Sequence, residues 1–298
     1  MSKTHIEACP VCHSTPLVHW NEVRDHSVTG EIFSVVECPQ CALRLTQDHP
    51  GQADIGRYYQ SDAYVSHTDS RKGLVNRLYH LVRSYMLGRK ARLLMRHRKQ
   101  GAVLDIGAGT GYFLDHMRQR GWHVSGLEPD ARARKVAHAR FGLDLQTPDQ
   151  LHWLADDSFD AITLWHVLEH VHTLDAYLHT LHRILRPGGL LVIAVPNHTA
   201  FDAAHYGTDW AAYDVPRHLW HFAPKSMRTL HARHACRVTG QRGRPFDAYS
   251  ESLLSERYRG SALGLLRAPV IGTFSNLRAL FNQDRASSVI YLAQHADQ

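Results

Sequence analysis

The sequence predicts an α/β protein in which a doubly wound parallel sheet follows a small cysteine-rich module. Three observations indicate this fold class. Short apolar segments alternate with helical segments between residues 102 and 241. A glycine-rich turn at 107–111 follows the first of these apolar segments, where ligands bind in such sheets. Two CxxC pairs lie within the first 47 residues. A chain of 298 residues is long enough for one large and one small domain.

The composition is that of an ordinary globular protein, with 44% hydrophobic and 21% charged residues. No run of eighteen apolar residues occurs, and "MSKTHIEACPVC" at the start has no apolar signal segment. We therefore expect a cytoplasmic protein. The net charge of +6 provides a mild attraction for RNA, acidic lipid or a nucleotide-linked substrate.

The cysteine-rich module, residues 1–47, is predicted to be a zinc ribbon. "CPVC" provides Cys9 and Cys12, "CPQC" provides Cys38 and Cys41, and the residues between the pairs form a predicted hairpin. This spacing is typical of a tetrahedral zinc site with four cysteine ligands. The alternative, a pair of disulfides, suits secreted chains. A closed site of four cysteines keeps no open coordination position, so the Zn²⁺ is expected to be structural.

Residues 48–100 are predicted to form a helical linker segment. The segment "IGRYYQSDAYVSH" is rich in tyrosine and precedes a long helix at about 74–98. Its aromatic rings either cover a bound ligand through cation–π attraction or tie the ribbon to the main domain. Both interpretations stay open.

The main domain, residues 101–298, has seven predicted strands. An insertion at 244–286, partly helical by its pattern, precedes the last strand and could cover a substrate pocket. The predicted strands are 102–106, 122–127, 143–146, 159–164, 189–195, 236–241 and 287–294, with helices at 110–120, 130–140, 148–154, 174–185 and 224–234.

The glycine loop indicates which ligand binds there. Its GxGxG spacing matches neither the GxGxxG dinucleotide motif nor a P-loop. Asp105 precedes the loop and would repel a pyrophosphate, but it suits a cationic ligand. Glu128 ends the next strand, where an acid accepts hydrogen bonds from ribose hydroxyls. A ribose and a cation without phosphate describe S-adenosylmethionine.

Four segments, "VLDIGAGTGYF", "GLEPD", "FDAITLWHVLEHV" and "LRPGGLLVIAVPN", resemble the signature segments of class I S-adenosylmethionine-dependent methyltransferases in order and spacing. The resemblance covers about residues 75–240. It implies a Rossmann-like sheet of seven strands, methyl transfer from S-adenosylmethionine, and a helical lid over the cofactor within the linker segment 48–100. The cofactor-binding residues that it implies are Asp105, Gly107, Ala108, Gly109, Gly111, Tyr112, Glu128, Pro129, Trp165, His166 and, from the lid, Tyr64.

Residues for the methyl acceptor are expected after the fourth and fifth strands. Glu169 and His170 follow the fourth strand, and His218 follows the fifth in "YDVPRHLWHF". Transfer to a hydroxyl or an amine requires removal of a proton, a task that suits histidine. We therefore predict His170 and His218 as candidate catalytic bases, with Glu169 orienting one of them or binding the acceptor.

A divalent metal is an alternative at this place. Ubiquinone-biosynthesis O-methyltransferases and small-RNA 3′-terminal methyltransferases carry a similar ExxEH turn that binds one. Here His166 stands at the first position, which removes one oxygen ligand. A third interpretation is that Glu169 and His170 only cap the helix or pack in the core.

The predicted acceptor is a small or sugar-linked molecule. The ribbon together with "DVPRHLWHF" resembles bacterial methyltransferases found with sugar and cell-envelope enzymes. One alternative is an RNA methyltransferase, since zinc-ribbon ribosomal RNA guanine methyltransferases share this plan and the charge suits RNA. Another is a non-enzymatic zinc-ribbon interaction protein with a vestigial cofactor fold, against which the intact Asp105, Gly107, Gly109 and Glu128 argue.

Overall fold

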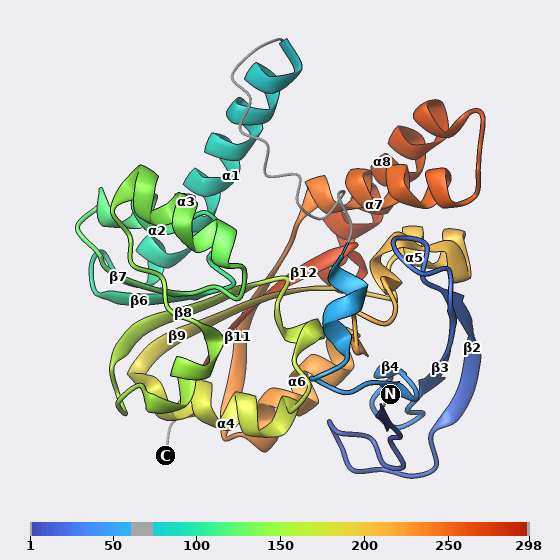
Figure 1. Cartoon of the computed structure of the whole chain (residues 1–298), viewed down its shortest axis with the longest axis horizontal. Coiled ribbons are helices and arrows are strands. Elements are labelled where there is room, and N and C mark those ends of the chain that lie inside the picture. The colour runs from blue at the N-terminus through green and yellow to red at the C-terminus, as the bar shows by residue number, and fades with distance from the viewer. Residues whose placement is uncertain (1, 61–73, 297–298) are drawn as a thin grey trace. The chain divides into compact units, whose positions relative to one another are not determined.

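The computed structural model describes residues 2–60 and 74–296, and the side chains of all of these except 74–82 (Figure 1). It confirms the predicted α/β class. The strands are β1 (Lys3–Thr4), β2 (Val18–Arg24), β3 (Ile32–Glu37), β4 (Arg44–Thr46), β5 (His49–Pro50), β6 (Ala102–Ile106), β7 (His123–Leu127), β8 (Phe159–Trp165), β9 (Leu185–Pro196), β10 (Trp220–His221), β11 (Cys236–Gly243) and β12 (Ser288–His295). The α-helices are α1 (Leu74–His97), α2 (Tyr112–Arg118), α3 (Ala131–Phe141), α4 (Leu174–Ile184), α5 (Phe201–Tyr206), α6 (Pro224–Arg233), α7 (Pro245–Tyr258) and α8 (Gly264–Phe281).

The central sheet has six strands in the order β11-β12-β9-β8-β6-β7. Strand β6 pairs in parallel with both β7 and β8. The strand expected at 143–146 is reduced to a single parallel bridge between Leu127 and Gln146. Pro148 begins a 3₁₀-helix directly afterwards (Pro148–Trp153), so the segment leaves the sheet before a second pair can form.

The chain divides into two compact units. The second unit comprises Val65–Trp165, Leu178–Val192 and Ala293–Gln298, and it includes β6, β7 and β8. Helix α2 buries Phe113, Leu114 and Met117 because these residues recur at helical spacing. The carboxyl ends of its parallel strands lie at one edge, which is the edge where the glycine loop begins.

The first unit comprises Met1–Tyr64, His166–Tyr177 and Ile193–Leu292. It holds a four-stranded sheet in the order β10-β4-β3-β2, in which Trp220 pairs with Leu45. One apolar core joins Phe33 and Val35 of β3 to Trp210 and Tyr213. Residues 1–47, predicted to be a zinc ribbon, share both their sheet and their core with residues 200–221. A ribbon of this size has too few apolar residues for a core of its own.

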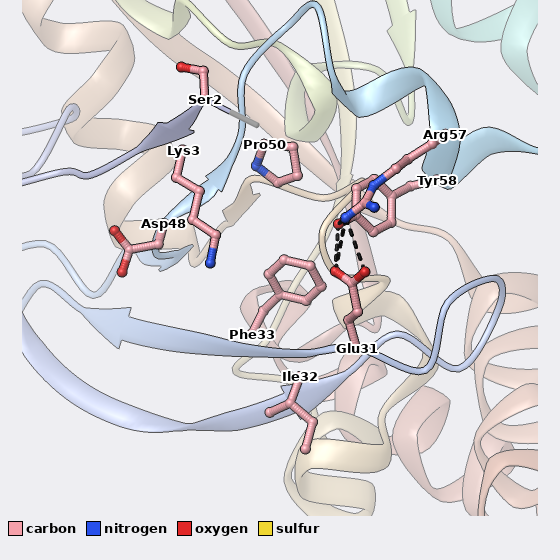
Figure 2. A pocket seen from close by; sticks show the side chains of 9 residues that line it. All are labelled: Ser2, Lys3, Glu31, Ile32, Phe33, Asp48, Pro50, Arg57 and Tyr58. Carbon is pink, nitrogen blue, oxygen red and sulfur yellow. Dashed lines mark hydrogen bonds and ion pairs between the residues drawn. The ribbon is translucent and has the colours of Figure 1, made fainter.

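The predicted aromatic segment contributes Tyr58 to the same core, where this side chain is 1% exposed. Its hydroxyl donates a hydrogen bond of 2.6 Å to Glu31 Oε2, and Arg57 contacts both residues (Figure 2). These side chains line a cavity of about 190 Å³ together with Lys3 and Asp48, among others. Tyr58 thus ties the linker to β3. The cavity contains none of the predicted catalytic or cofactor residues.

The predicted insertion at 244–286 contains α7 and α8, which pack against each other (Figure 1). Within the described part of the chain, no helix has both the length and the apolar character needed to cross a membrane.

Candidate functional site

The glycine loop connects β6 to α2. Gly107, Gly109 and Gly111 have φ angles of 73°, 55° and 80°, a region that favours glycine. A Cβ at Gly111 would lie 3.0 Å from Leu143 Cδ1, whereas a Cβ at Gly109 would meet no protein atom within 4 Å. Gly111 is therefore required for packing, and Gly109 leaves its backbone open to a ligand.

Asp105 and Glu128 lie at the ends of β6 and β7. Asp105 is 2% exposed and accepts a hydrogen bond of 2.5 Å from the Thr163 hydroxyl. Burial raises the pKa of Asp105 to about 6, against the opposing effect of Lys90. Glu128 Oε2 accepts from the Gly109 N–H at 2.7 Å. The two predicted acids thus lie in the same unit as the glycine loop, and their role toward a ligand stays a prediction.

The remaining cofactor candidates of the second unit differ in their surroundings. Ala108 donates its N–H to the Leu127 carbonyl, and the Pro129 carbonyl accepts from Arg134. Trp165 lies under the Lys90 ammonium, 4.1 Å from the ring centroid.

Tyr112 is held by two cations, because the guanidinium groups of Arg83 and Arg140 lie 3.8 Å and 4.8 Å from its ring centroid. This contact gives Tyr112 a packing role beside its predicted one. Tyr64, the candidate from the lid, lies outside the described residues.

His166, also a predicted cofactor residue, is engaged with acids of the first unit. Its backbone is left-handed, with φ of 58°. The ring lies between two carboxylates, with Nδ1 3.3 Å from Glu169 Oε1 and Nε2 3.0 Å from Asp247 Oδ2. Burial and Arg244 lower its pKa, but the two carboxylates outweigh them and raise it to about 9. His166 is therefore a cation at neutral pH.

The three predicted acceptor-side residues lie together in the first unit. Glu169, His170 and His218 offer ligand atoms that all lie within 4.8 Å of one another. The two imidazole rings meet edge to face with centroids 4.6 Å apart. Glu169 is fully buried, and neither carboxylate oxygen has a hydrogen-bond donor of acceptable geometry among the described residues. His166 Nδ1, 3.3 Å from Oε1, supplies a charged neighbour. A buried carboxylate whose hydrogen-bonding capacity is not filled is costly unless something binds it.

Backbone carbonyls determine the tautomers of both histidines. His170 Nδ1 lies 3.0 Å from the Arg217 carbonyl, and His218 Nδ1 lies 2.8 Å from the Ala212 carbonyl. A carbonyl only accepts, so each Nδ1 carries the hydrogen and each Nε2 keeps its lone pair. Tyr59 Oη also lies 3.0 Å from His170 Nδ1. Burial and His218 lower the pKa of His170 to about 4, so His170 is neutral at pH 7.

Arg217 holds the loop that carries His218. It is 2% exposed, and its guanidinium donates to both carboxylate oxygens of Asp214, to Asp25 at 3.2 Å and to the Tyr58 carbonyl at 2.7 Å. Asp25 also accepts backbone N–H groups of its own turn, including that of Thr29. The loop after β9 is thereby anchored to the N-terminal hairpin.

Two acids near the site were not predicted from the sequence. Asp247 and Glu251 are four residues apart on α7, so they share one face of the helix. Arg244 and His166 lower the pKa of Asp247 to about 2 against the effect of burial, whereas burial and Asp247 raise the pKa of Glu251 to about 8. In the sequence, these two acids could have been recognised by their i,i+4 spacing inside a mostly apolar insertion.

The four predicted zinc ligands also lie together. Their sulfur atoms form one cluster, with Cys9 3.5 Å from Cys41 and Cys12 3.4 Å from Cys38, and all four are free thiols. Tetrahedral zinc with Zn–S bonds of about 2.3 Å separates its sulfurs by about 3.8 Å. The hydrogen bond from Cys41 lowers the pKa of Cys9 to about 5, which favours the thiolate that zinc binds.

Two left-handed residues form the knuckles around this cluster. His13 and Ala42 have φ of 59° and 60°, and they donate their N–H groups to the Cys9 and Cys38 carbonyls at 2.8 Å. Both CxxC pairs thus have the same backbone geometry, and their donor set fits one tetrahedral Zn²⁺. The fifth cysteine, Cys236, is buried at the start of β11.

Comparison with known proteins gives consistent matches. A family model described as a methyltransferase domain matches residues 78–239. The ubiquinone biosynthesis O-methyltransferase of Maricaulis maris is 31% identical over 140 residues, which cover 43% of this chain and 55% of that protein. The protein of the same name from Xanthomonas oryzae is 32% identical over 130 residues, or 40% of this chain and 54% of that one. The chain thus spans about half the length of these curated relatives.

Solved structures share the fold at low sequence identity. The 1,6-didemethyltoxoflavin-N1-methyltransferase of Burkholderia thailandensis is 15% identical with a TM-score of 0.52, over 92% of this chain and all of that chain. A SAM-dependent methyltransferase from Archaeoglobus fulgidus is 18% identical with a TM-score of 0.50, over 71% of this chain and 93% of that one.

Proposed function

This chain belongs to the S-adenosylmethionine-dependent methyltransferases, and on that premise we propose that it methylates an oxygen of a small hydroxylated acceptor bound at Glu169, His170 and His218. The observation that carries the proposal is the cluster of His170 and His218 with the buried Glu169, whose ligand atoms lie within 4.8 Å of one another. The Glu169 carboxylate has an ion-pair contact with His166 but no hydrogen bond of acceptable geometry among the described residues. An acceptor hydroxyl supplies the missing donor to Glu169 and leaves its proton within reach of an imidazole.

The proposed step balances as a single displacement. The acceptor oxygen forms a bond to the methyl carbon, the sulfonium–carbon bond breaks, and S-adenosylhomocysteine leaves. The hydroxyl proton passes to an imidazole Nε2. His170 is a weak proton acceptor because its pKa is about 4, so we assign the proton to His218 and the orientation of the acceptor to His170 and Glu169.

The divalent-metal alternative fits these residues poorly. The ring of His166 lies where the resembled metal-binding turn has its first carboxylate, and it contacts Glu169 at 3.3 Å. Its two carboxylate contacts keep this ring protonated, and a cation there repels a divalent ion. Proton transfer to histidine therefore carries the proposal.

The chemical class of the acceptor follows from two further points. The curated relatives are named O-methyltransferases, which supports oxygen as the methyl acceptor. The ribbon and the "DVPRHLWHF" segment favour sugar-linked or cell-envelope intermediates within that class. We also propose that Cys9, Cys12, Cys38 and Cys41 hold one structural Zn²⁺ and that the cofactor binds at the Asp105–Glu128 loop.

The experiment supplies labelled S-adenosylmethionine with separate pools of phenols and quinols, sugar-linked intermediates and RNA. With the accepted pool, His218→Ala should lower turnover by about 10²–10⁴-fold and leave S-adenosylmethionine affinity unchanged. His205→Ala, which changes an exposed histidine of α5, is the matched control. Full turnover in both His170→Ala and His218→Ala would contradict the assignment, and label in RNA alone would favour the RNA alternative. Loss of activity on chelation with recovery on adding Mg²⁺ would favour the metal.

A further inference from the structure

Helix α8 presents its small residues to the protein and its large residues to the outside. Its buried positions are all small and recur at helical spacing: Gly264, Ala268, Gly272, Ser275 and Ala279. A Cβ at Gly272 would lie 2.7 Å from the Tyr249 ring and 3.1 Å from the Ala248 carbonyl on α7. The small stripe therefore permits close packing of the two helices, and it leaves the large apolar side chains on the opposite face.

That outer face is apolar along the whole helix. Leu265 at its start is 78% exposed, Leu280 is 73% exposed, and Phe281 at its end is 92% exposed. Further exposed apolar side chains of α7, α8 and their connection are Phe246, Tyr249, Leu253, Leu254, Leu263, Leu266, Val270, Phe274 and Leu277. We call these twelve residues and the two helices that carry them the hairpin surface. A contiguous apolar surface of this extent marks an interaction site.

The charges on this surface have one sign. Arg267 and Arg278 are exposed on α8, near its two ends, and α8 contains no acidic residue. None of the three acids of α7 is exposed, since Asp247 is 9% and Glu256 is 2% exposed and Glu251 is half-buried. An apolar helix face flanked by arginines, with no exposed acid, matches a bilayer interface in which acyl chains meet anionic headgroups.

A second copy of the chain fits less well. A symmetric contact through α8 would bring Arg267 and Arg278 of each copy together without an acid from that helix to neutralise them. Close helix pairing also depends on small residues, and those of α8 are already packed against α7.

We propose that the hairpin surface lies on an anionic membrane, with Leu265, Phe274 and Phe281 inserted among the acyl chains and Arg267 and Arg278 at the lipid phosphates. The helix lies in the interface and does not cross it, because no described helix has the length and apolar character to span. This inference depends on the hairpin surface alone and goes beyond the proposed methylation.

The test is flotation of the full chain with vesicles of phosphatidylcholine, alone or with one third phosphatidylglycerol. The wild type should float with the anionic vesicles and dissociate at high salt. The triple variant Leu265→Ser, Phe274→Ser, Phe281→Ser should lose at least about 10-fold in partitioning. The double variant Arg267→Gln, Arg278→Gln should lose roughly 25-fold in partitioning on the anionic vesicles, at about fivefold for each arginine, and should be unchanged on phosphatidylcholine alone.

Matched controls lie outside the hairpin surface. Trp153→Ser removes a side chain that is 82% exposed, and Arg132→Gln removes an exposed arginine of α3, so both should float like the wild type. An unchanged melting temperature shows that each variant is folded. If the triple variant does not fold, the double arginine variant still tests the proposal. Two results would overturn the proposal. In the first, the wild type floats with neither kind of vesicle. In the second, the wild type binds no vesicles but sediments as a dimer, and the triple variant sediments as a monomer.

Discussion

Replacing Arg217 by methionine should destabilise the first unit strongly. Methionine keeps much of the side-chain volume but removes the guanidinium, which leaves Asp214 and Asp25 without their buried cation. Breaking a buried ion pair by removing one partner costs about 3–5 kcal/mol. Asp25 still accepts N–H groups of its own turn, which limits the loss at that end, so we expect about 3–4 kcal/mol.

Scanning calorimetry of the full chain measures this effect. At roughly 2–4 °C per kcal/mol for a unit of this size, the melting temperature should fall by about 6–16 °C. The control Arg132→Met, on the exposed face of α3, should stay within about 0.5 kcal/mol of the wild type. Adding Asp214→Asn should recover part of the loss, because it removes one of the stranded charges. If Arg217→Met and Arg132→Met melt together, the buried arginine does not anchor the loop and this reasoning is wrong.

Further predictions concern the cofactor, the zinc site and acid stability. Asp105→Asn and Glu128→Gln should each weaken S-adenosylmethionine binding by at least about 10-fold in calorimetry, since each removes a negative charge at the glycine loop. Tight NAD binding by the wild type would contradict the cofactor assignment. The wild type should contain one equivalent of zinc by elemental analysis, and Cys12→Ser should abolish it. A zinc-free wild type with four free thiols would refute the ribbon. Burial lowers the pKa of His231 to about 4. Between pH 6.5 and 4 the unfolded chain therefore binds a proton at His231 that the folded protein does not. As the pH falls through this range, the free energy of unfolding should drop by about 3 kcal/mol, and above pH 6.5 it should be unaffected by this group. His231→Leu should therefore flatten the stability profile in denaturant titrations between these pH values, and an unchanged slope would count against it.

The sequence predicted most of what depends on local pattern. The strand–helix alternation and the glycine loop predicted the confirmed fold class and the confirmed methyltransferase family, since both depend on short-range periodicity and backbone conformation. The knuckles of the cysteine module follow from spacing in the same way. The role of each predicted site residue stays a prediction.

Features that depend on distant segments were not accessible from a single sequence. Nothing in "LWHVLEH" indicates that His166 lies against Asp247, which is 81 residues further along the chain. The strand expected at 143–146 is reduced to a single bridge because the chain leaves the sheet there, which the local pattern of those residues does not indicate. Similarly, the pairing of β4 with β10 joins segments far apart in the sequence. Whether a segment pairs as a strand, and with which partner, depends here on tertiary contacts more than on local propensity.

The pairing of β10 with β4 has a consequence for the timing of synthesis. The ribbon strands leave the ribosome first, but the strand that completes their sheet, Trp220–His221, is made about 175 residues later. At roughly 5–20 residues per second, the edge of β4 waits about 9 to 35 seconds for its partner. During that interval Leu43 and Leu45, which are fully buried in the finished protein, are exposed beside an unpaired strand. Early occupation of the cysteine cluster by a metal would hold the ribbon in shape while it waits, so zinc supply during translation should determine how much of the chain reaches its native state.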